Sequence, residues 1–272
     1  MAGLHKRIIN TLFFSVLGVY LGAGVFLNLC YVFSVPGLET FWRPHSYIVN
    51  LVIGFFGFLA GAFLLLASSK IERGNVEKTI LTLLGLTAIF FGTGGLSMGI
   101  IEGLGGGEFL TGSQLTLENI IPPIGFLLSI IAGVTAIVVM TVNSYPILSR
   151  TQLLLAILIP IGVFVILGVL SFSRIPAIKL YGFVKIIALF FAAVCLGIVA
   201  VTTFIMMAFG RGKGRAYWLN IATGIMLSGL SGLAAIFCYA VGGKWVGLTL
   251  LGFTTSMAFL GFAGYKRWQK VK

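Results

Sequence analysis

The sequence predicts an all-α polytopic membrane protein, a bundle of about eight transmembrane helices with both termini in the cytoplasm. Three observations predict this class. Hydrophobic residues make up 59% of the chain and charged residues only 9%, which is too little polar surface to face water. The apolar runs reach the roughly 20 residues that a spanning helix needs. Basic residues are abundant in every second connection, as in polytopic proteins.

Eight apolar runs are long enough to span a bilayer. In chain order they cover residues 8–34, 47–69, 80–101, 121–143, 151–172, 183–209, 217–241 and 246–265. No small-residue cleavage site follows the first run, so we expect it to remain in the mature chain. Little sequence is left over for a soluble domain. The sequence therefore predicts a single integral membrane domain over residues 1–272, with a faint 4+4 helix repeat.

The distribution of Lys and Arg predicts the orientation of the helices. The termini and every second connection hold 13 of the 18 basic residues: Lys6, Arg7, Lys70, Arg73, Lys78, Arg150, Arg211, Lys213, Arg215, Lys266, Arg267, Lys270 and Lys272. The opposite side holds only five, together with four of the six acids. Because positive charge stays on the inner side, the basic side is predicted to be cytoplasmic. The net charge of +12 then reflects topology and anionic lipid headgroups, and nucleic acid is not an expected partner.

Several kinds of chemistry have no residues to support them. The two histidines lie in a terminus and a connection, so the spans lack the axial ligands of a bis-His haem, and neither haem nor metal is expected. The three cysteines fall inside apolar runs without paired spacing and are predicted to be small core residues. The last two spans carry no central lysine for retinal, and no nucleotide loop or hydrolase set is present.

The acids are the main functional evidence, because ionisable residues at membrane depth are costly. Glu72 and Glu77 are interpreted as solvated residues of a cytoplasmic turn, and Glu39 as part of an interfacial aromatic belt. Glu102 closes the third span and Glu118 opens the fourth, so both are predicted at one level near the outer face. Glu118 has two interpretations: a helix cap that complements the macrodipole, or a proton acceptor in a partly desolvated pocket.

The connection between the third and fourth spans, which holds both of these acids, contains three consecutive glycines and ends in Pro122 and Pro123. Glycines permit tight backbone, and proline is favoured in the first turn of a helix. We therefore expect the two prolines to fix the start of the fourth span.

Four segments carry a family resemblance: "FGFLAGAFLLLA" (56–67), "GLTAIFFGTGGLSMGIIEGL" (85–104), "LENIIPPIGF" (117–126) and "VLSFSRIPAIKLYGFVKIIALFFAAVCLG" (169–197). Together they resemble the NrfD-like family of membrane anchor subunits of dimethyl sulfoxide reductase and polysulfide reductase. The resemblance covers residues 50–240 through gapped motifs. It departs from the family where Glu102 or Ile101 stands in place of a histidine, so any acid–base role there passes to a carboxylate.

The resemblance implies a haem-free anchor subunit in a prokaryotic plasma membrane. It implies that a menaquinone-like quinone binds near the outer face and exchanges electrons with an iron–sulfur subunit, beside a molybdopterin-type catalytic subunit. Glu118 and Glu102 would then exchange protons. An apolar slot in the glycine-rich helix pair would be anchored by Arg174, Lys179, Tyr181 and Lys185.

Two other classes stay open. An ion-translocating or transporter subunit also has many spans and abundant glycine, but such proteins usually place charges at mid-bilayer, where this chain has no acid. A non-catalytic scaffold or assembly subunit uses its small residues only for close helix packing, as "GIMLSGLSGLAAIF" (224–237) suggests.

Overall fold

The computed structural model describes residues 2–37, 46–104, 117–144, 149–151, 154, 158, 195–203, 206, 215–240 and 246–270. All regular structure in these ranges is helical. The complete described helices are α1 (Ala2–Val32), α3 (Ser46–Ser69), α4 (Val76–Gly103), α5 (Leu117–Ser144), α8 (Arg215–Ala240) and α9 (Val246–Lys270). Six described helices are long and apolar enough to cross a membrane, which makes the chain a polytopic membrane protein.

Six of the eight predicted spans are thus confirmed as helices. Several of them extend further than their apolar runs, and α4 and α9 show why. α4 begins at Val76, where the Asn75 side-chain oxygen accepts a hydrogen bond from the Glu77 backbone N–H at 2.9 Å and caps the helix. α9 continues to Lys270 through a basic last turn, where positive charge complements the macrodipole. The predicted spans 151–172 and 183–209 lie mostly outside the described residues.

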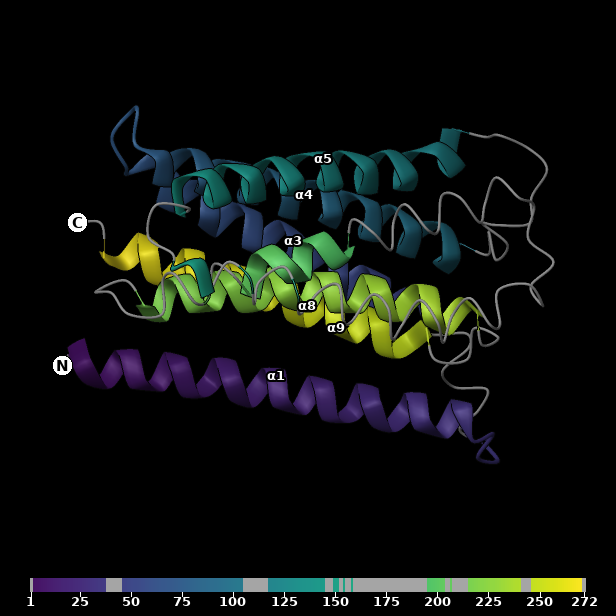
Figure 1. The fold of residues 1–272 in the computed structure, drawn as a ribbon. Helices are drawn as coiled ribbons and strands as arrows, with labels where there is room; N and C mark the ends of the chain where they lie inside the picture. Colours follow the sequence, from purple (N-terminus) through teal and green to yellow (C-terminus); the bar gives the residue numbers. More distant parts are fainter. Residues whose placement is uncertain are drawn as a thin grey trace.

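The described helices pack in the order α5, α4, α3, α9 and α8, with each one against the next (Figure 1). One apolar core joins all five. It contains Leu64 of α3, Leu81 of α4, Met140 of α5, Ile221 of α8 and Leu260 of α9, each almost completely buried. Hydroxyl groups in the spans bond backbone carbonyls: Ser129 of α5, for example, donates to the Thr87 carbonyl of α4 at 2.9 Å. These bonds satisfy polar groups that water cannot reach in a bilayer.

Helix α1 stands apart from this core and lies along the outside of the bundle (Figure 1). It packs mainly on α9, where Phe13 stacks on Phe262 with ring centroids 4.2 Å apart. Its other faces present apolar side chains such as Val16 and Val19 outward. Apolar exposure of this kind suits contact with lipid or with another membrane helix.

Two cysteines are buried and free, as predicted for small core residues. They are Cys30 of α1 and Cys195 of the 195–203 helical segment.

Candidate functional site

The two predicted acids lie on adjacent helix ends. Glu102 lies in the last turn of α4 and Glu118 in the first turn of α5. These helices pack side by side and run in opposite directions, so the ends that carry the acids lie at the same end of the bundle (Figure 1). The termini of the chain lie at the other end. The side chains of both acids are outside the described part of the chain, so a carboxylate pair stays a prediction.

The four other predicted quinone-binding residues, Arg174, Lys179, Tyr181 and Lys185, fall in the segment 159–194, outside the described residues. Their association with the two acids stays a prediction as well.

Pro122 and Pro123 do not mark the start of α5, which corrects the expectation from sequence. The helix begins at Leu117, and both prolines lie inside it, in its second turn. Proline has no N–H to give to the carbonyl four residues earlier. The carbonyls of Glu118 and Asn119 therefore lack their usual helical donors. Two hydrogen-bond acceptors are added in this way to the helix end that carries the acid.

The described glycines of α3, α4 and α5 allow the helices to pack closely. We had expected a glycine-rich helix pair to form an open slot, but these glycines lie in closed helix contacts. A Cβ atom added to Gly57 of α3 would lie 2.6 Å from the Cα of Gly92 in α4. One added to Gly125 of α5 would lie 2.9 Å from the backbone nitrogen of Gly94. Backbones that approach so closely leave no room between them for a ring.

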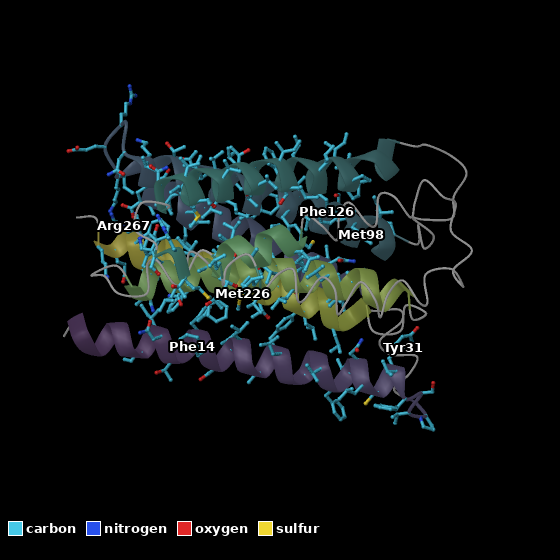
Figure 2. The ribbon with its side chains drawn as sticks, in the orientation of Figure 1. Phe14, Tyr31, Met98, Phe126, Met226 and Arg267 are labelled. Carbon is cyan, nitrogen blue, oxygen red and sulfur yellow. The ribbon has the colours of Figure 1, made fainter. Side chains whose placement is uncertain are left out.

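An ion pair that the sequence did not reveal lies at the opposite end of the bundle. Arg267 of α9 donates from Nε and Nη2 to the two carboxylate oxygens of Glu77 in α4, each at 2.7 Å. The side chains are only 27% and 20% exposed. The interpretation of Glu77 as a solvated turn residue is therefore wrong. Figure 2 shows Arg267 at the end of the bundle where both termini lie.

Tyr217 of α8 completes this cluster. Its ring lies 5.9 Å from the Arg267 guanidinium carbon. Its hydroxyl is buried close to the Glu77 carboxylate. The amide nitrogen of Asn220, one turn later, is also buried and has no hydrogen-bond partner among the described residues. The cluster therefore joins α4, α8 and α9 through one charged pair and one aromatic ring. Its sequence signal is weak, because the two charges are far apart in the chain and each looks like an ordinary turn or end residue.

Asn28 of α1 is the second polar feature that sequence reasoning missed. It is 0% exposed, and both polar atoms of its side chain lack partners in the described structure. One turn on either side of it, Gly24 lies against Leu251 of α9, and Tyr31 packs against the Val49 and Ile53 cluster of α3. A buried amide without partners is costly, so this position needs an explanation.

Comparisons with family models, curated proteins and solved structures found no match for this chain. The family resemblance is therefore carried by the quoted segments alone. Within the described ranges, no group of three His, Cys, Asp or Glu residues is placed to hold a metal ion.

Proposed function

We propose that the chain is a haem-free membrane anchor subunit of a respiratory oxidoreductase in a prokaryotic plasma membrane. It binds a menaquinone-like quinone near the end of the bundle that carries Glu102 and Glu118, and it exchanges electrons with an iron–sulfur partner subunit. The observation that supports this proposal most is the packing of α4 against α5, which places both acid-bearing helix ends together.

The available groups suit the chemistry of a quinol. Bound quinol supplies two hydroxyl donors, and its oxidation releases protons that need acceptors. The proline-freed carbonyls of Glu118 and Asn119 accept hydrogen bonds and orient such a ring, while a carboxylate accepts the proton. Partial burial of the carboxylates would bring their proton affinity closer to that of the quinol. Because glycines close the described seams between α3, α4 and α5, we propose that the apolar slot lies beside the α4–α5 end. Arg174, Lys179, Tyr181 and Lys185 are its proposed anchors.

Replacing each acid by glutamine tests the proposal. We expect Glu118→Gln and Glu102→Gln to reduce quinol oxidation per assembled complex by about 100-fold or more, the usual contribution of a proton acceptor. Glu72→Gln, in the exposed turn at the opposite end, is the matched control and should leave turnover unchanged. If Glu118 is only a cap, its replacement lowers stability by about 0.5–2 kcal/mol and spares turnover. Unchanged turnover in both glutamine variants would reject the quinone site.

The predicted partners are tested by purifying the native complex and identifying co-migrating chains by mass spectrometry. An iron–sulfur protein with a molybdopterin subunit is expected. Purification of the chain alone, with ion-dependent transport in vesicles, would favour the transporter class and contradict the anchor proposal.

A second candidate, a non-catalytic scaffold subunit, is favoured by the glycine seams. They show that many of the small residues serve close packing, as at Gly57 and Gly92. The two candidates differ in the glutamine variants: a scaffold keeps full complex activity in both.

A further inference from the structure

A lateral cavity of about 320 Å³ opens between α1, α3 and α9 in the half of the bundle nearest the termini. We refer to it as the α1 groove. Phe13 of α1, Phe56 and Phe63 of α3, and Phe262 of α9 supply most of its aromatic wall. Apart from the Tyr265 hydroxyl, its lining side chains are apolar.

The groove exists because α1 diverges from α3. In the half far from the termini, Leu27 and Tyr31 of α1 pack against the Val49 and Ile53 cluster of α3 and close the gap. Toward the termini, α1 keeps its contact with α9 through Phe13 and Phe262, but the space between α1 and α3 stays open. In a membrane-spanning chain such a lateral opening faces hydrocarbon, so the chemistry of the wall selects an acyl chain.

Positive charge lies at the mouth of the groove. The Lys266 ammonium sits 4.1 Å from the ring centroid of Phe262, one of the wall residues. Lys266 follows directly after Tyr265, the last wall residue in the chain, and Lys270 lies one turn further. At the same end of the bundle, the first two turns of α1 carry Lys6 and Arg7 in the sequence. A headgroup whose acyl chain fills the groove therefore meets cations.

We propose that the α1 groove is a binding site for one anionic phospholipid, with an acyl chain against Phe13, Phe56 and Phe262 and the phosphate headgroup beside Lys266. The site is independent of the proposed quinone site, which lies at the opposite end of the bundle. Lipid bound there supports α1, which has few contacts with the other described helices.

The test uses the full chain in bilayer nanodiscs that contain phosphatidylcholine and phosphatidylglycerol, with retained lipid counted by native mass spectrometry. We expect one phosphatidylglycerol to be retained in preference to phosphatidylcholine. Lys266→Gln should reduce this preference about fivefold, the effect of one basic residue near an anionic headgroup. Arg73→Gln, in the exposed α3–α4 turn, removes the same charge away from the groove and should leave the preference unchanged.

A second pair of variants tests the cavity itself. Leu59 lines the groove from α3, and Leu66 is an exposed residue two turns further along α3 that does not line it. Leu59→Trp should abolish retention of the lipid, whereas Leu66→Trp should leave it intact. Thermal unfolding of each variant confirms that it is folded.

Equal retention of the neutral and the anionic lipid would overturn the proposal, and so would equal effects of Leu59→Trp and Leu66→Trp. Retention of added quinone in place of phosphatidylglycerol would assign the groove to a quinone tail and would also overturn it.

Discussion

At the scale of single residues, Asn28 gives the most direct prediction. Its buried amide has no partner among the described residues, so replacing it with leucine, of similar size, removes a desolvation cost of about 1–3 kcal/mol. We expect Asn28→Leu to unfold at a higher temperature than the wild type in the same detergent. Asn50→Leu is the control, because Asn50 is also buried but has an interaction, and this variant should be destabilised. A destabilised Asn28→Leu would mean that the amide has a partner in the membrane.

The Glu77–Arg267 pair gives a second prediction at this scale. Its bidentate geometry and partial burial should make it stronger than a typical surface pair, so we expect a coupling energy of about 1–2 kcal/mol. A double-mutant cycle with Glu77→Gln and Arg267→Gln, read by denaturant unfolding, measures it. Glu72→Gln should be neutral. A coupling energy near zero would show that solvent screens the pair.

At the scale of helices, the α3–α4 seam depends on glycine. A methyl group at Gly57 would lie 2.6 Å from the Cα of Gly92, so the helices must separate. We expect Gly57→Ala to destabilise the protein by about 1–3 kcal/mol, the usual cost of overpacking. Gly18→Ala in α1 meets no atom within 4 Å and should be neutral or stabilising by about 0.5–1 kcal/mol. Thermal unfolding of both variants makes the comparison, and a neutral Gly57→Ala would show that the seam can relax.

The described helices were predictable, because a spanning helix requires only a continuous apolar run of sufficient length, which is a local property of the sequence. The predicted run 47–69 matches the apolar part of α3, Tyr47–Ser69, because about 20 apolar residues permit only a spanning helix. The same local reasoning gave the wrong position for the two prolines relative to the start of α5. Pro122 and Pro123 favour a helix start nearby, but the helix begins at Leu117 and tolerates both in its second turn.

The site was less predictable than the helices, since long-range pairing leaves no local signal. Glu77 and Arg267 each look like the polar end of an apolar run, and only the packing of α4 near α9 brings them together. Asn28 looked like an ordinary residue within an apolar run, and its burial depends on α9 and α3. That the helix ends carrying Glu102 and Glu118 lie at the same end of the bundle was predictable, because α4 and α5 are consecutive antiparallel helices.

At the scale of the whole molecule, the charge distribution predicts eight spans with both termini and the 70–78 turn in the cytoplasm, and residues 105–118 outside. Single cysteines introduced at Arg73 and at Gly106, in a chain whose native cysteines are replaced by alanine, test this. A membrane-impermeant thiol reagent added to intact cells should label the cysteine at 106 and not the one at 73. Labelling only at position 73 would show that the predicted orientation is reversed, and the proposed quinone site would then lie on the cytoplasmic side.

The contact of α1 with α9 joins two helices that are far apart in the sequence. The Tyr20 hydroxyl donates to Thr254 across 234 residues, and the stacked pair Phe13 and Phe262 is similarly distant. Because α1 precedes α9 by more than 200 residues, a ribosome releases α1 well before α9, and α1 enters the bilayer before its main partner among the described helices has been made. During that interval, the membrane-insertion machinery or the surrounding lipid covers the apolar surface of α1 that later contacts α9. The contact between α1 and α9 therefore forms only after α9 has been synthesised.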